Sequence, residues 1–530
     1  MKIYKSFKIL LMLVLILMLI NGCGPKNAGM SGVKEENDKP KIAYYAYSTE
    51  PFIDLDPSVE YSNGIVTLHN IYETLTKYNH KTQKVEPLLA ESWESSEDGT
   101  HWNFKLRQGI KFHDGAILNA EAVKKSLDRT IAMKMGAAYI WDSVKEIKAT
   151  DEYTVEFELD YAAPIDLIAS AAYASFIMSP NVAEKDSTWF NEGNEAGTGP
   201  YTLQKATKGE EVVLAKFDEY WRGWKENQYD RVIIKKISES TSRRQLVEKG
   251  DAQITTSLST TDINALKNHS NLVVTEAASW KNVMGFLNTR KKPLDNADFR
   301  KALSYAFPYE EIVTNVKENQ ASQSYGLIPE GLWGHDASLP QYHFDLDKAK
   351  ELLEKSGVKA EGLKLEMTLT AGAEAHRNAA QLYQVNLKKL GIDLEIREMN
   401  WDSVWEKSKS KSPNDRQDIL VMYWWPDFPS PISWLWSLVH SEENILFNLS
   451  YINNPKLDEM IEQGDQLSAV DREKSEELFK QVQKEVIEQA YQIFMYDDKT
   501  IWVTNKNFKG FESNPSYEGV VFFYDTYYEE

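Results

Sequence analysis

The sequence predicts a large α/β protein with at least two lobes, exported from the cytoplasm. The chain has 530 residues, which is more than one hydrophobic core usually supports. Segments with the two-residue alternation of strands are interspersed with segments that have the three-and-four spacing of helices. An apolar leader opens the sequence and is followed by a long polar body.

The leader has the features of a secretory signal. Three lysines precede an apolar run from Ile9 to Ile20, which is short for a membrane span and typical of a signal-peptide core. We expect residues 1–22 to be a signal peptide. The run ends in "INGC", which resembles a bacterial lipobox and implies cleavage before Cys23 and lipid attachment to it. An uncleaved helical anchor is the alternative.

The composition of the chain after the leader limits its possible disulfides and binding partners. Cys23 is the only cysteine, so no internal disulfide can form. Residues 23–40 are small, polar and charged, and we expect a flexible tether before a folded body that starts near Ile42. The formal charge of −20 becomes −23 without the three leader lysines. Such a charge argues against nucleic acid or an anionic membrane surface as a partner.

The first part of the body shows mixed structure. The segments 154–160 ("TVEFELD") and 231–237 ("RVIIKKI") have the composition of strands. The segment from Ala120 ("AEAVKKSLDRTIA") has apolar positions three and four apart, which predicts a helix.

The clearest pattern lies between residues 363 and 425. Alternating apolar residues predict a strand over 363–369, and 392–396 is a second strand. Helical spacing predicts a helix between them that ends at Gly391, with inner-face residues Ala375, Ala379, Leu382 and Val385. A short helix at 401–409 and an apolar strand at 418–425 follow. Two βα units followed by a strand predict a parallel sheet with right-handed connections.

A candidate site follows from this sheet. Ligands of open α/β sheets bind beyond the carboxyl ends of the strands, and Asp427 follows the end of the strand 418–425 within "MYWWPDFPSP". His376 and Arg377 follow the strand 363–369 at the same edge. We expect Asp427 to bind a ligand ammonium group and Arg377 or His376 a ligand carboxylate. The aromatic residues between these poles are Trp424, Trp425 and Phe428. A short peptide carries both charges.

Each of these residues also has a purely structural interpretation. Asp427 lies between two prolines and is a suitable turn residue. Arg377, near a helix start, is equally explained as a solvated surface residue. The tryptophans and Phe428 are explained as core residues, since large aromatic side chains are often buried.

The body resembles the extracytoplasmic solute-binding proteins of ABC importers, in the oligopeptide and dipeptide-binding class known as family 5. The resemblance rests on the following segments, in this order: "LDP" (55–57), "IYETLTKY" (71–78), the stretch 85–127, "GTGPYTL" (197–203), "EYWRG" (219–223), the stretch 284–307, "WWPDFPSP" and "NPKLDEMI" (454–461).

The resemblance implies a two-lobed α/β fold of the class II periplasmic-binding-protein type, with an extra subdomain inserted in the first lobe and the ligand between the lobes. It implies that Asp427 pairs with a peptide amino group, that Trp424 lines a side-chain pocket, and that His376 and Arg377 lie where relatives bind the ligand carboxylate. The expected ranges are 41–77, 191–290 and 499–530 for lobe I, 78–190 for the inserted subdomain, and 291–498 for lobe II.

We therefore expect the substrate-binding component of an ABC transporter, which closes on short peptides and delivers them to membrane permease subunits. It should act as a monomer without a cofactor or a metal, attached to the membrane only by its lipid. Oligosaccharides and metal complexes are alternative ligands. No nucleophile elbow, zinc-binding helix or P-loop is present in the sequence. A secreted glycosidase remains an alternative, because paired catalytic acids have no fixed spacing.

Overall fold

The computed structural model describes residues 40–530. The leader, Cys23 and nearly all of the tether lie outside the described residues. Among the described residues, no helix combines the length and the apolar character needed to cross a bilayer.

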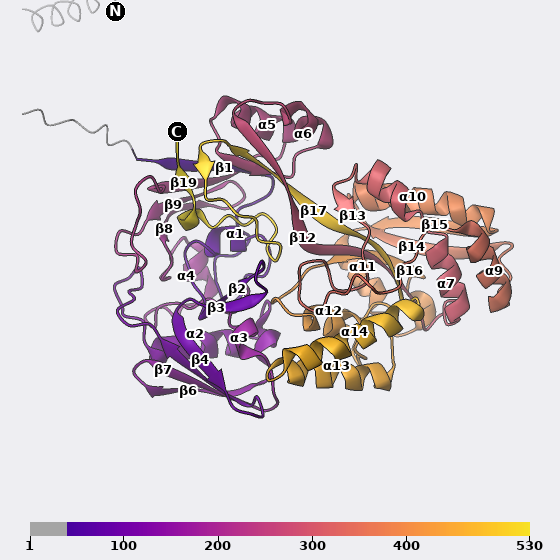
Figure 1. Ribbon diagram of the computed structural model, residues 1–530, viewed down its shortest axis with the longest axis horizontal. Helices are drawn as coiled ribbons and strands as arrows, with labels where there is room; N and C mark the ends of the chain where they lie inside the picture. Colours follow the sequence, from indigo (N-terminus) through magenta and orange to yellow (C-terminus); the bar gives the residue numbers. More distant parts are fainter. Residues whose placement is uncertain (1–39) are drawn as a thin grey trace, which may run out of the picture. The chain divides into compact units, whose positions relative to one another are not determined.

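A mixed sheet of eleven strands runs through the body (Figure 1). Its strand order is β15-β14-β16-β12-β17-β11-β1-β10-β9-β8, and β13 pairs with β17 beside this path. The bounds are β1 Ile42–Tyr47, β8 Tyr201–Thr207, β9 Glu211–Lys216, β10 Arg231–Lys236, β11 Ile254–Thr256, β12 Leu272–Leu287, β13 Ala321–Ser322, β14 Leu363–Thr370, β15 Ile392–Met399, β16 Ile419–Trp424 and β17 Gln492–Asn505.

Two long strands, β12 and β17, connect the two halves of this sheet (Figure 1). Up to Ala278, β12 pairs with the second half of β17; from Asn282 onward it pairs with the first half of β17 and with β16. The strand neighbours of β12 therefore change at residues 279–281. The change lies inside one strand because both halves share one sheet.

We call the half that contains β1 and β8–β11 lobe I and the half that contains β14–β16 lobe II; the residue ranges expected for each remain a prediction.

A separate four-stranded sheet, β4-β5-β7-β6, lies between β1 and β8 in the sequence. The bounds are β2 Thr76–Asn79, β3 Lys84–Pro87, β4 Ala90–Ser95, β5 His101–Leu106, β6 Val144–Asp151, β7 Thr154–Leu159, β18 Phe508–Lys509 and β19 Tyr527–Tyr528. The strands expected near residues 154 and 231 are β7 and β10.

The helices follow the predicted spacing in several places, including the helix expected from Ala120. Their bounds are α1 Ile65–Leu68, α2 Ala120–Met133, η1 Ala138–Trp141, α3 Ile165–Ile168, α4 Ser187–Asn191, α5 Ser240–Lys249, α6 Thr260–Leu266, α7 Ala297–Tyr305, α8 Tyr309–Glu311, η2 Ile312–Val316, α9 Leu346–Ser356, α10 Glu374–Lys389, α11 Trp401–Ser408, η3 Pro413–Asp415, α12 Ile432–Leu438, α13 Pro455–Ser468, α14 Arg472–Glu488 and η4 Phe523–Asp525.

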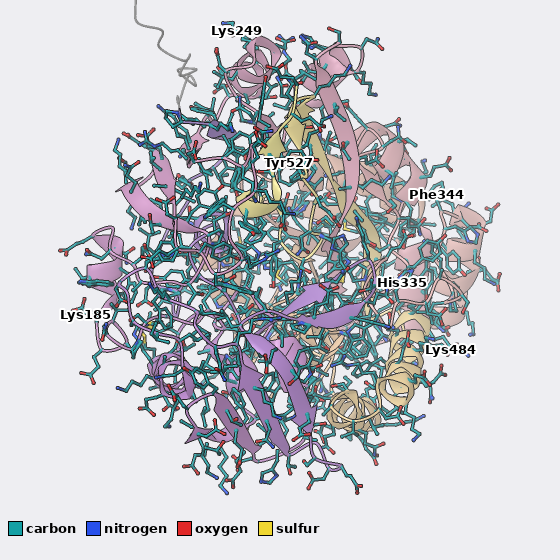
Figure 2. The ribbon with its side chains drawn as sticks, turned by 60° about the vertical axis from the view of Figure 1, so that its left-hand side comes forward. Lys185, Lys249, His335, Phe344, Lys484 and Tyr527 are labelled. Atoms are coloured by element: carbon teal, nitrogen blue, oxygen red, sulfur yellow. The ribbon has the colours of Figure 1, made fainter. Side chains whose placement is uncertain are left out.

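The surface helices are amphipathic. On α14, Val482 and Val486 are buried, while Lys484 is exposed and points outward (Figure 2). Lys249, the last residue of α5, is likewise exposed in Figure 2, whereas Val247 two residues earlier is buried. This alternation is what a helix that covers one face of a sheet requires.

The predicted parallel strands of lobe II are confirmed. Strand β14 pairs in parallel with β15 on one side and with β16 on the other. Helix α10 ends at Lys389, and Gly391 follows with φ 86°, a left-handed conformation that glycine adopts at low cost. Because β12 adds antiparallel to β16, the complete sheet is mixed.

The inner face expected for α10 is only partly correct. The helix buries Ala379, Tyr383 and Leu387, whereas Val385, expected on the inner face, is 57% exposed. The Tyr383 hydroxyl donates to the Leu303 carbonyl at 2.9 Å. The Tyr383 ring is large, and its buried hydroxyl needs an acceptor, so Tyr383 determines which face of α10 points inward. The single valine has a smaller effect.

Candidate ligand-binding site

Successive side chains of a strand point to opposite faces, so the aromatic residues at the end of β16 point to different sides. Tyr423 is 41% exposed and stacks with Trp425, with ring centroids 5.2 Å apart. Trp424 points to the opposite side, is 9% exposed and donates its indole N–H to the Ser433 carbonyl at 2.8 Å. Trp425 therefore faces open space, while Trp424 is part of the core.

Asp427 lines a cavity of about 160 Å³, which we call the Asp427 cavity. Its walls come from residues 139–143, from residues 161–168 and from lobe II, where Phe428, α12 and Asp465 contribute. The described residues that line this cavity include no lysine, arginine or histidine. It is an acidic space with aromatic walls, and it joins lobe II to the segment that carries the four-stranded sheet.

The environment of Asp427 disfavours an isolated charge. Burial raises the pKa of its carboxyl to about 6, and a hydrogen bond from Tyr139 offsets part of that effect. At neutral pH the carboxyl is mostly ionised, although no cation compensates it within the cavity lining. A ligand cation would supply the missing partner.

A second cavity of about 330 Å³ lies next to β12 and the end of β16, and we call it the Lys281 cavity. Tyr423 and Trp425 of lobe II line it together with Lys281, Glu518 and Tyr173. Trp425 lines this cavity, and Asp427, two residues later, lines the other. The two cavities are therefore neighbours.

Among the described residues that line these two cavities, Lys281 is the single lysine, arginine or histidine. Its ammonium group is already paired with carboxylates. Its ammonium group lies 3.1 Å from the Glu518 carboxylate and 3.7 Å from that of Asp498. It also lies over the Tyr423 ring, 4.9 Å from the centroid. Burial by itself would lower the pKa of Lys281, but Glu518 and Asp498 outweigh that effect and raise it.

Most of the chain also matches the model of a known protein family. Residues 84–445 match the model of the bacterial extracellular solute-binding proteins, family 5 Middle. The chain is a family 5 solute-binding protein. Members of this family are transport binding proteins and not enzymes, so the chain acts by binding, and the glycosidase alternative does not hold.

Relatives and solved structures agree with the family. The Escherichia coli protein described as a probable D,D-dipeptide-binding periplasmic protein, DdpA, is 32% identical over 481 residues, which cover 88% of this chain and 90% of that protein. The E. coli dipeptide-binding protein is 27% identical and covers 84% of this chain and 87% of its own length.

Solved structures share the fold. The Helicobacter pylori periplasmic binding protein DppA, solved in complex with the peptide STSA, has a TM-score of 0.75 at 23% identity and covers 92% of this chain and 98% of its own. A putative peptide-binding protein, AppA, from Clostridium difficile has a TM-score of 0.80 at 22% identity and covers 92% and 100%. The two-lobed α/β fold of this family 5 protein is thereby established.

The expected basic pole is not at either cavity of this family 5 protein. Arg377 pairs with Glu398 at the surface, with its Nε 2.6 Å from the carboxylate, and it lines neither cavity. Burial lowers the pKa of His376 to about 4, so its ring is neutral at pH 7. Their role toward a ligand carboxylate stays a prediction.

Of the residues that the sequence predicted to bind a ligand, Asp427, Phe428 and Trp425 line a cavity and Trp424 does not. The sequence did not predict several charged residues of the same walls. These are Lys281, Glu518, Asp142 and Asp465. They come from β12, from the C-terminal segment, from the end of η1 and from α13, which are distant in sequence. Only the aromatic context of Asp427 marked this site in the sequence.

Proposed function

We propose that this protein captures short peptides with a free amino terminus between its two lobes and delivers them to the permease subunits of an ABC importer. The single observation that carries the proposal is Asp427, a carboxylate without a compensating cation in an aromatic-walled cavity. The names of several relatives, which describe dipeptide-binding proteins, support peptide as the ligand.

A direct experiment identifies the ligand. The mature protein is purified and denatured, and the released small molecules are analysed by mass spectrometry. We expect short peptides with unmodified amino termini. Recovery of oligosaccharides or of a metal complex without peptide would contradict the proposal. Calorimetry with synthetic peptides then measures the affinity of the recovered class.

The proposed mechanism is closure around the ligand, which favours the closed form by its differential contacts. A charged contact joins α14 of lobe II to α3 beside the four-stranded sheet. Arg472 donates from one nitrogen to both oxygens of Asp166, at 2.7 and 2.6 Å, and Asp166 is 5% exposed. We infer that this pair stabilises the closed form.

Asp166→Asn should therefore weaken peptide binding by about five- to tenfold. The neutral amide still accepts a hydrogen bond, but it removes about 1 to 1.5 kcal/mol of charge attraction to the partly exposed Arg472 in the closed form. Calorimetry measures the affinity, and small-angle scattering measures the radius of gyration with and without peptide. Asp298→Asn is a suitable control, because it breaks an ion pair with Lys355 within lobe II. An unchanged radius of gyration on binding would count against closure.

We also propose that the protein is lipid-anchored through Cys23, which lies outside the described residues. Cys23→Ala should leave the protein unacylated and shift it from the membrane fraction to the soluble fraction. Two acyl chains on one residue supply the stable anchoring that one chain does not. Cell fractionation with mass analysis of the mature amino terminus checks this. Retention in the membrane with an intact leader would indicate the helical anchor instead.

A further inference from the structure

The Asp427 cavity contains more carboxyl groups than one ligand ammonium group requires. Asp142 and Asp465 line it together with Asp427. Burial raises the pKa of Asp465 to about 7 and also raises that of Asp142, where Lys134 partly offsets the effect. No hydrogen bond or ion pair satisfies the Asp465 carboxylate among the described residues, and burial is the only influence on its pKa.

Two tyrosines show that the three carboxylates surround one space. Burial raises the pKa of Tyr161 to about 12, and Asp465 and Asp142 both add to this effect. Burial also raises the pKa of Tyr139, with contributions from Asp427 and Asp142. Each ring therefore lies close to two of the acids. Among the described residues, no group of three or more His, Cys, Asp or Glu side chains could hold a metal ion.

An unpartnered polar group points independently to a ligand. Ser143 lines the same cavity, is 3% exposed, and its hydroxyl has no hydrogen-bond partner. A buried hydroxyl without a partner is costly. A polar group of a ligand in this cavity would form a hydrogen bond with the Ser143 hydroxyl and would also contact the nearby carboxylates.

The neighbouring Lys281 cavity does not compensate this charge. Its lysine is already paired with Glu518 and Asp498. The lining of the two cavities taken together contains four carboxylates and one lysine. A ligand with an excess of positive charge fits this distribution better than a neutral zwitterion does.

We propose that Asp142 and Asp465 form a subsite for a second positive charge on the ligand, next to the ammonium group held by Asp427. The ligand class is a peptide whose first residue is lysine or arginine. The cavity volume of about 160 Å³ is sufficient for such a side chain, since a cavity of about 150 Å³ accepts benzene. The rings of Tyr139 and Tyr161 provide cation–π contacts. The inference rests on the proposed function.

The test compares matched peptides by calorimetry. Lys-Ala and Lys-Ala-Ala are compared with norleucine-Ala and norleucine-Ala-Ala, which keep the length of the side chain and remove its charge. We expect the wild type to bind the lysine peptides at least about tenfold more tightly, because the second cation meets two carboxylates in a partly desolvated space. In the Asp142→Asn/Asp465→Asn double variant this preference should fall to within about twofold.

The norleucine peptides also control for folding, since they should bind the double variant as well as they bind the wild type. Asp160→Asn is the matched charge control. Asp160 is exposed beside Tyr161 and influences its pKa, but it does not line the cavity, so the lysine preference should persist in this variant.

Three results would overturn the inference. Equal binding of lysine and norleucine peptides to the wild type would contradict the subsite and leave the proposed peptide function intact. A preference for lysine peptides that persists in the double variant would do the same. If neither class of peptide binds the wild type, the proposed function fails and the subsite fails with it.

Discussion

Asp427→Asn should weaken the binding of free peptides by about 2 to 5 kcal/mol, which is about thirtyfold or more in affinity. The amide keeps the shape of the side chain and removes its charge, so the ligand ammonium group is left buried without a counter-charge. Calorimetry with free and N-acetylated peptides measures this effect. Acetylated peptides lack the ammonium group, so they should bind the wild type poorly and be nearly indifferent to the substitution.

The stability of the unliganded protein provides a second measurement on the same variant. Because burial raises the pKa of Asp427 to about 6, the folded protein binds a proton there more readily than the unfolded chain, and the ionised carboxylate lowers stability above that pH. Asp427→Asn should thus leave thermal stability at pH 7 unchanged or raise it. Peptide affinity within about twofold of wild type, together with a loss of stability, would identify Asp427 as a turn residue.

The same pKa predicts how binding depends on pH. Only the ionised carboxylate attracts the ammonium group, so free-peptide affinity should be full above pH 6 and fall as the pH decreases through about 6. The Asp427→Asn variant should lack this dependence. Titrations between pH 5 and pH 8 on both proteins separate this residue from other groups that titrate in the same range.

Asp56→Ala should destabilise the folded protein by about 3 to 5 kcal/mol, since it leaves a buried arginine without its counter-charge. Asp56 is fully buried, and it accepts from Arg129 at 2.7 and 2.6 Å and from the Ser187 hydroxyl at 2.7 Å. These contacts attach helices α2 and α4 to the segment "LDP". Urea or guanidinium unfolding monitored by circular dichroism measures the change in free energy.

A double-mutant cycle isolates the charge pair. Arg129→Met removes the cation and keeps much of its apolar contact with the Phe190 ring, which lies 5.0 Å from the guanidinium carbon. Combined with Asp56→Ala, it should recover part of the lost stability, because no buried charge is then left alone. If the two substitutions add without coupling, the pair contributes through packing and not through its charges.

Local pattern was sufficient for the strands and helices between residues 363 and 425. Alternation of apolar residues determines that 363–369 is a strand, and the glycine at position 391 marks the end of the helix before the next strand. These features depend on neighbours within a few residues, so the sequence contains them directly. The side of α10 that faces the core was not predictable, because Tyr383 needs an acceptor, the Leu303 carbonyl, from another helix.

The sequence by itself determined the class of the protein, the parallel strands β14–β16 and the position of Asp427 at their carboxyl edge. Tertiary structure alone decided which tryptophan is buried, since Trp424 at the end of β16 points into the core and Trp425 stacks on the exposed Tyr423. It also decided the charge of the site. Asp142 and Asp465 line one cavity with Asp427 only because the fold brings distant segments together, and electrostatic interactions act through space without regard to separation along the chain.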